Sequence, residues 1–173
     1  MKIKQFVAIV TGASSGIGEA PAEWLARAGY KVYGTSRRGA QAGKRSFEML
    51  TLDVTRDESV EAAVGEVMRL DGRIDLLVNN AGFSVAPAGA EESSIEQAQS
   101  IFDTNFFGTV RMTRAVVPHM RHQGGCRIIN IGGRRDSKRP AARRVDGFVA
   151  SHSGPGQVVE TPATKFADVP APD

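Results

Sequence analysis

The apolar residues of this 173-residue chain fall into two alternating patterns. Short runs rich in β-branched residues predict buried strands, whereas longer segments with apolar residues three or four positions apart predict amphipathic helices. Strands that alternate with helices are typical of an α/β fold built on a parallel sheet. The predicted strands are residues 6–10, 30–35, 47–52, 73–78 and 126–131, and the predicted helices are residues 19–28, 57–70 and 95–122.

The first predicted strand leads through a glycine-rich turn, residues 11–18, directly into the first helix. Gly12, Gly16 and Gly18 let the backbone turn sharply and approach a ligand, while the start of the helix offers unpaired N–H groups. Such a turn suits a phosphate. The spacing G-x-x-x-G-x-G differs from the G-x-G-x-x-G of many dehydrogenases and from a P-loop. By itself, this spacing is also compatible with a strand–helix turn that binds no ligand.

Two arginines follow the second predicted strand. In a dinucleotide-binding fold, an acidic residue at this place accepts hydrogen bonds from the adenosine ribose, whereas an arginine pairs with a 2′-phosphate. Arg37, followed by Arg38, therefore favours NADP over NAD as the cofactor. The alternative is a solvated charge pair at the end of a strand.

Four motifs occur in the order and spacing of the short-chain dehydrogenase/reductase family: Thr11 to Gly18, Asp53-Val54, Asn79-Asn80-Ala81-Gly82 and Asn105. Over residues 3 to about 132 the chain resembles NADP-linked members that act on hydroxysteroids, retinol or similar apolar alcohols. The resemblance implies a Rossmann-type, doubly wound parallel sheet in three α/β/α layers. It also implies hydride transfer between NADP(H) and a small-molecule alcohol or ketone.

The resemblance assigns roles to individual residues. Asn105 corresponds to the residue that kinks the long helix and holds a water in the proton relay, although a buried amide satisfied by the core is the alternative. Asp53 corresponds to a residue that contacts the adenine. The alternative is that this segment serves only to cap the following helix, with Thr55 as the capping residue. The implied cofactor-binding residues are Gly12, Ser14, Ser15, Gly16, Ile17, Gly18, Arg37, Arg38, Asp53, Val54, Asn79, Ala81 and Gly82.

The resemblance ends after residue 132. In the family, a serine and then Tyr-x-x-x-Lys on a helix follow the fifth strand, because the tyrosine exchanges a proton with the substrate and the lysine lowers its pKa. Here Gly133 stands at the serine position, and the chain's two tyrosines are Tyr30 and Tyr33. We therefore expect Asn105 to be the only surviving catalytic residue and the chain to be catalytically impaired.

Residues 133–173 differ in composition from the rest and lack a sustained period of 3.6 or 2. They hold five of the eight prolines, and Arg, Pro, Ala, Gly and Ser make up 23 of the 41 residues, as expected from a GC-rich gene read in a shifted frame. We expect residues 1–132 to form a partial dinucleotide-binding domain, incomplete on its C-terminal side, and residues 133–173 to form a disordered tail. The fifth strand would then be an exposed edge that lowers solubility. The alternative is a basic arm for nucleic acid.

Charge and composition limit the classes of partner and the cellular location that we expect. The net charge is +3, and residues 1–132 are nearly neutral, so we expect neither nucleic acid nor a membrane as a partner. The apolar run near the N-terminus is too short for a signal peptide, and the single Cys126 excludes an intramolecular disulfide, so a cytoplasmic protein is expected.

His119 and His122 have no neighbouring carboxylate or thiol that would complete a metal site, so no metal is expected. The family implies homo-oligomers among relatives, an assembly that we do not expect the incomplete chain to reproduce. A non-catalytic dinucleotide-binding module remains the alternative function. A methyltransferase, which has a similar first loop, is disfavoured by Arg37 and by Asn79-Asn80-Ala81-Gly82.

Overall fold

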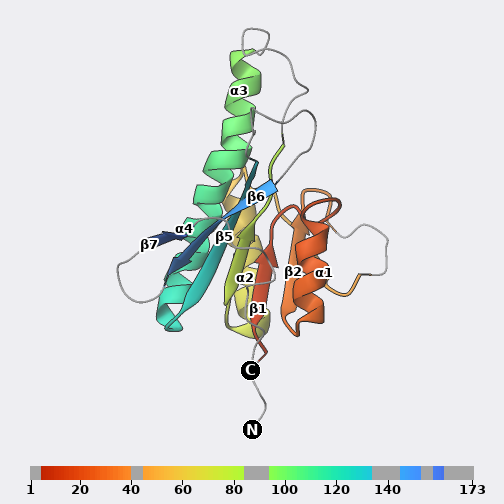
Figure 1. The fold of residues 1–173 in the computed structure, drawn as a ribbon, viewed down its shortest axis with the longest axis vertical. Coiled ribbons are helices and arrows are strands. Elements are labelled where there is room, and N and C mark those ends of the chain that lie inside the picture. The colour runs from red at the N-terminus through yellow and green to blue at the C-terminus, as the bar shows by residue number, and fades with distance from the viewer. Residues whose placement is uncertain (1–4, 40–44, 84–93, 134–144, 153–157, 162–173) are drawn as a thin grey trace.

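The computed structural model describes residues 5–39, 45–83, 94–133, 145–152 and 158–161. Strands and helices alternate through most of these residues, as the sequence predicts (Figure 1). The strands are β1 (Val7–Val10), β2 (Lys31–Ser36), β3 (Glu48–Thr51), β4 (Leu76–Asn79), β5 (Cys126–Gly133), β6 (Val145–His152) and β7 (Val158–Thr161). The helical elements are α1 (Glu19–Arg27), α2 (Asp57–Asp71), α3 (Ile95–Phe102), the π-helical turn η2 (Asp103–Phe107) and α4 (Gly108–His122).

The strands form one sheet in the order β3-β2-β1-β4-β5-β6-β7. The first five strands are parallel, with Ile9 of β1 paired to Tyr33 of β2 and to Leu77 of β4. This confirms the predicted Rossmann-type parallel sheet for the part of the chain before residue 134. Because parallel strands end at the same edge, the loops that follow β1, β2, β3 and β4 meet there.

The two faces of the sheet are covered by different helices, which gives the three α/β/α layers. Val7 and Ile9 pack with residues of α2 and α4, whereas Ala8 and Val10 pack with residues of α1 on the other face. All four residues of β1 are therefore buried, which explains why this strand is a continuous apolar run rather than an alternating one.

The structure differs from the sequence prediction in the last part of the chain. Residues 133–173 were expected to lack regular structure, but β6 pairs antiparallel with β5 from Gly133↔Val145 to Cys126↔His152, and β7 pairs antiparallel with β6. Without β6, the edge of β5 would present unpaired backbone groups, and valine-containing segments such as Val158–Thr161 favour strands. The expectation of an exposed β5 edge is therefore wrong, while the division into a domain and a tail stays a prediction.

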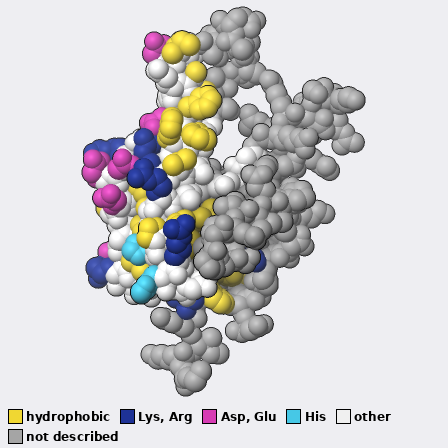
Figure 2. All heavy atoms as spheres, turned by 90° about the vertical axis from the view of Figure 1, so that its left-hand side faces the viewer, with side chains coloured by type: hydrophobic (Ala, Val, Ile, Leu, Met, Phe, Trp, Pro, Cys, Tyr) yellow, Lys and Arg dark blue, Asp and Glu magenta, His cyan; other side chains and the backbone are white. Residues whose placement is uncertain are grey.

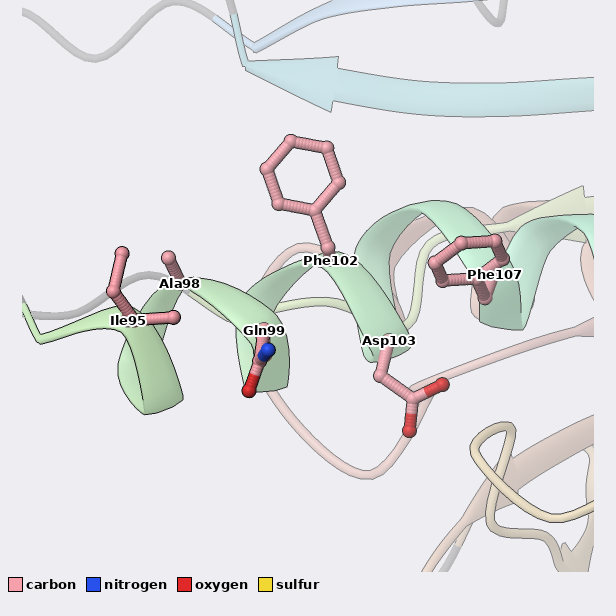
Figure 3. A pocket seen from close by; sticks show the side chains of 6 residues that line it. All are labelled: Ile95, Ala98, Gln99, Phe102, Asp103 and Phe107. Carbon is pink, nitrogen blue, oxygen red and sulfur yellow. The ribbon is translucent and has the colours of Figure 1, made fainter.

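The long helix is divided by η2, and several of its large apolar side chains are exposed. Phe102 is 61% exposed and Ile95 69% exposed, and Phe106, Phe107 and Val110 are also exposed. Figure 2 shows hydrophobic side chains gathered over this helix. An open groove of about 370 Å³ lies there, and Figure 3 shows the Phe102 ring standing clear of the backbone.

We predict that Phe102→Ser reduces self-association of the purified chain. Burying one phenylalanine at a contact between copies is worth about 1.5 to 3 kcal/mol, so association should weaken about tenfold or more. Light scattering as a function of protein concentration measures the effect. Leu70→Ser is the matched control, because Leu70 is an exposed apolar side chain on α2. Equal changes in the two variants would show that the α3 surface has no special part in association.

Candidate functional site

The glycine-rich turn lies where β1 meets α1, packed against the segment that follows β4. Gly12 has a φ of 68°, and a Cβ there would lie 2.9 Å from the Ala81 Cα. A Cβ on Gly18 would overlap the Asn80 side-chain nitrogen and the Gly12 carbonyl oxygen. These two glycines are therefore required by the close approach of two backbone segments, in addition to any ligand.

Hydrogen bonds join the two segments. The Thr11 hydroxyl accepts from the backbone N–H groups of Asn80 and Ala81, both at 2.9 Å. The Asn80 side-chain nitrogen donates to the carbonyl oxygens of Thr11 and Gly12 at 3.0 and 3.1 Å. Asn80 was quoted in the sequence motif but left out of the predicted binding residues, and the structure shows that it holds the turn in place.

The turn and the start of α1 have the features that a phosphate needs. Gly18 is the N-cap of α1, and it provides no side-chain hydrogen bond to the first turn of the helix. Gly16, with a φ of 63°, has open space where a Cβ would stand, and Ser15 and Ile17 beside it are exposed. The first N–H groups of α1 thus lack a capping side chain, so these residues fit a dinucleotide pyrophosphate.

The predicted specificity residues lie beside this turn. The Ala13 N–H donates to the Thr35 carbonyl at 2.9 Å, which ties the turn to the end of β2. Ser36 is buried, and its hydroxyl accepts from the Arg38 N–H at 3.3 Å and donates to the Gly39 carbonyl at 3.2 Å. Arg37 and Arg38 are exposed. Their backbone is therefore held next to the glycine turn while their cationic side chains face solvent.

Asp53 and Val54 follow β3 at the same edge of the sheet. The Asp53 carboxylate accepts from the Thr55 N–H at 3.0 Å and from the Thr55 hydroxyl at 2.7 Å. Burial raises the pKa of Asp53, but the Thr55 hydrogen bonds outweigh it and, with the nearby charge of Arg37, hold that pKa below its usual value. The predicted capping role of Thr55 is wrong, because Arg56 is the N-cap of α2 and the Thr55 hydroxyl is taken by Asp53.

The residues after β4 divide between two neighbours. Asn79 is 5% exposed, and its side-chain nitrogen donates to the Asn130 side-chain oxygen of β5 at 2.9 Å, whereas Ala81 faces the glycine turn. The Asn79 side-chain oxygen has no hydrogen-bond partner in the described residues. The structure therefore places Ala81 against the turn and directs Asn79 towards β5.

Asn105 lies in η2, which interrupts the long helix as the resemblance implies. Its side chain accepts from the Phe83 N–H at 3.0 Å and donates to the Phe83 carbonyl at 2.9 Å. A Cβ on Gly82 would lie 3.0 Å from the Asn105 side-chain oxygen, so Gly82 permits this contact. The amide thus binds the segment after β4 to the helix, and its part in a proton relay stays a prediction.

Neither tyrosine reaches this edge of the sheet. Tyr33 is fully buried in the core, and its hydroxyl donates to Asp71 at 2.6 Å, at the end of α2. Tyr30 precedes β2, at the opposite end of that strand from Arg37, and packs against Phe6 with ring centres 5.9 Å apart. Burial raises the pKa values of both phenols. The described residues therefore bring the binding motifs and Asn105 together without a tyrosine.

Two absences apply to the residues that the structure describes. Among them, no three or more histidine, cysteine, aspartate or glutamate residues are arranged to hold a metal ion. No helix in the same part of the chain combines the length and the apolar character needed to cross a membrane.

Comparisons with known proteins agree with this geometry. The family model for short chain dehydrogenases matches residues 6–143. A 3-ketodihydrosphingosine reductase of Bacteroides thetaiotaomicron is 44% identical over 127 residues, which cover 72% of this chain and 46% of that protein. An NADP-dependent 3-hydroxy acid dehydrogenase of Shigella flexneri is 35% identical over 132 residues, which cover 73% of this chain and 53% of that protein.

Solved structures show the same relation. The ligand-free aldohexose dehydrogenase of Thermoplasma acidophilum superposes with a TM-score of 0.68 at 33% identity, covering 73% of this chain and 49% of that one. A 3-ketoacyl-(acyl-carrier-protein) reductase of Brucella melitensis, complexed with NADH, gives 0.68 at 34% identity, covering 72% and 56%. This chain spans about half the length of the curated relatives it matches. On its motifs, its sheet and these matches, the chain belongs to the short-chain dehydrogenase/reductase family.

Proposed function

We propose that this chain binds NADP(H) at the edge of the sheet formed by the glycine turn and the segments after β2, β3 and β4. The observation that carries the proposal is the turn itself, which the Thr11 and Asn80 hydrogen bonds hold open beside an uncapped helix start. Gly12, Ser14, Ser15, Gly16, Ile17 and Gly18 would bind the pyrophosphate and the adjoining ribose. Asp53, Val54, Asn79, Ala81 and Gly82 would line the adenosine.

The preference for NADP rests on Arg37 and Arg38. Both are exposed next to the turn, and the neighbouring Ser36 leaves this position without the carboxylate that would bind an unphosphorylated ribose. One relative's name specifies NADP, whereas the Brucella melitensis structure is a complex with NADH. Family membership is therefore compatible with either cofactor, and the arginines favour NADP.

We predict that Arg37→Ala weakens NADPH binding and spares NADH. A hydrogen bond to a charged group is worth about 1.5 to 3 kcal/mol, so the NADPH dissociation constant should rise about tenfold or more. Fluorescence titration with both nucleotides measures the change. Arg121→Ala, which removes an exposed cation from the end of α4, is the matched control. Equal affinities for NADPH and NADH in the unmutated chain would contradict the assignment.

In the intact relatives that this chain resembles, a bound nicotinamide would donate a hydride to a ketone or accept one from an alcohol. We propose the same substrate class for the lineage of this chain, with an apolar carbon skeleton, and the ketone named for the Bacteroides thetaiotaomicron relative accords with it. The present chain provides Asn105 and a binding edge but no tyrosine beside it, so we propose that it is catalytically impaired. A cytoplasmic location, without nucleic acid or membrane as partner, completes the proposal.

The alternative is a binding module that holds the dinucleotide and performs no chemistry. The observation that favours it is that both tyrosines are committed to other parts of the fold. Tight NADPH binding with no turnover of any alcohol or ketone is the result expected of both the impaired enzyme and the module. An intact Ser and Tyr-x-x-x-Lys in a shifted reading frame of the coding DNA would favour the enzyme lineage.

A further inference from the structure

Arg45, which precedes β3, reaches back to the glycine turn. Its terminal Nη2 donates to the Ser14 carbonyl oxygen at 3.0 Å, and its Nε donates to the Glu19 carboxylate at 3.3 Å. The Arg45 side chain is 13% exposed and the Glu19 side chain 38% exposed, so these contacts are partly shielded from water. Arg45 is outside all four sequence motifs, and its guanidinium contacts both the turn and the first residue of α1.

The contact with Ser14 fixes the middle of the turn from one side. The Ala13 N–H, in the preceding part of the turn, donates to the Thr35 carbonyl at 2.9 Å, so β2 holds the Gly12–Ala13 peptide and Arg45 holds the Ser14–Ser15 peptide. The next residues, Ser15 and Gly16, are exposed. Because a fixed peptide restricts the direction of the N–H groups that follow it, Arg45 sets how those groups are presented to a ligand.

The contact with Glu19 concerns charge. Glu19 is the first residue of α1, directly after the uncapped Gly18. A carboxylate there stabilises the helix, but it also repels a second anion at the same helix start. The guanidinium of Arg45 offsets that negative charge, since the ion pair is largely buried on the arginine side.

We propose that Arg45 is a positioning residue for phosphate binding, which holds the Ser14 peptide and offsets the charge of Glu19. This inference rests on the proposed dinucleotide site. It differs from the role of Arg37 and Arg38, because Arg45 acts on the turn that meets the pyrophosphate shared by NADP and NAD. Its loss should therefore weaken both nucleotides, whereas the loss of Arg37 should weaken NADP alone.

The test compares Arg45→Met with Ser46→Ala. Ser46 ties the same segment to α1, because its hydroxyl donates to Glu23 at 2.6 Å, one helical turn beyond Glu19. We expect Arg45→Met to raise the dissociation constants of NADPH and NADH alike, by about tenfold, and Ser46→Ala to change neither by more than about twofold. Equal weakening in the two variants, or no weakening in Arg45→Met, would overturn the proposal.

Further variants test whether Arg45 offsets the charge of Glu19. Glu19→Gln removes the negative charge, so the double variant Glu19→Gln/Arg45→Met should regain part of the affinity that Arg45→Met loses. Arg45→Lys, which keeps the charge but cannot make both contacts in the same geometry, should lie between the unmutated chain and Arg45→Met. A double variant as weak as Arg45→Met would overturn the charge-offsetting role.

Hydrogen exchange without nucleotide tests the positioning role independently of binding. We expect the backbone amides of residues 15–18 to exchange several-fold faster in Arg45→Met than in the unmutated chain or in Ser46→Ala. If the unmutated chain binds neither NADPH nor NADH, the proposed function fails, and the exchange rates still decide whether Arg45 holds the turn. Unchanged exchange in Arg45→Met would overturn that role.

Discussion

The purified 173-residue chain should transfer hydride between NADP(H) and alcohols or ketones at least about a hundredfold more slowly than an intact relative. A positioned proton donor or acceptor contributes about 10² to 10⁴ in rate. Hydride transfer to a carbonyl leaves an alkoxide that needs a proton at once, and the residues that line the proposed site include no tyrosine, histidine or lysine. The assay follows NADPH consumption with a panel of ketones, and NADP⁺ reduction with the matching alcohols.

The tyrosines and the two histidines of α4 in the described part of the chain do not replace the missing proton donor. Tyr33 is in the core with its hydroxyl bound to Asp71, and Tyr30 lies at the opposite end of β2 from the cofactor edge. His119 and His122 lie in the last turn of α4, whereas Asn105 precedes the first turn of that helix. Lys165 is outside the described residues. Turnover at the rate of an intact relative would contradict the prediction and would require a proton donor from elsewhere.

The coding DNA offers an independent check. If a frame change accounts for residues 133–173, shifting the frame by one base near codons 131 to 134 should reveal a serine, then Tyr-x-x-x-Lys about a dozen residues later, in keeping with the spacing that the family uses. The control is the same search in the other shifted frame. If neither frame contains that pair, the frame-change explanation is wrong and the tail must be regarded as selected sequence.

The parts of the fold that depend on local pattern could be predicted from the sequence. The run Val7 to Val10 is apolar at every position because both faces of β1 are buried, and this makes the strand recognisable without knowing its neighbours. Ser94 begins α3 with a capping box that involves Gln97, another signal within four residues. Strand and helix boundaries therefore differ from the predicted ones by only a few residues.

The features that depend on distant partners could not be predicted in the same way. The Thr55 hydroxyl could cap a helix or bind Asp53, and only the fold around it shows that Asp53 takes it. Arg45 lies in a polar loop whose sequence gives no sign that Ser14 and Glu19 are beside it. β6 pairs with β5 although residues 133–173 lack a sustained period, so the pattern of the tail itself did not predict this strand.

Gly18→Ala should destabilise the chain and abolish nucleotide binding, because the added methyl group has no space. It would overlap the Asn80 side-chain nitrogen and the Gly12 carbonyl, and that nitrogen donates the hydrogen bonds that tie the segment after β4 to the glycine turn. Overpacking costs about 1 to 3 kcal/mol, and the displaced amide loses about 1 kcal/mol more for each hydrogen bond. With two such hydrogen bonds, we therefore expect the free energy of unfolding to fall by about 3 to 5 kcal/mol.

Denaturant titration measures this change in the free energy of unfolding. In the same experiment, variants of two other glycines distinguish the effect of crowding from that of backbone strain. Gly16 has a φ of 63° but open space around it, so Gly16→Ala should cost only the left-handed conformation, about 1 to 2 kcal/mol. Gly65 is exposed in the middle of α2 with nothing near a Cβ, so Gly65→Ala should stabilise the chain by about 0.5 to 1 kcal/mol. A Gly18→Ala variant as stable as the unmutated chain would show that Asn80 is free to move away. The two segments would then not be fixed by these contacts, and the glycine turn would not be held open in the way that phosphate binding requires.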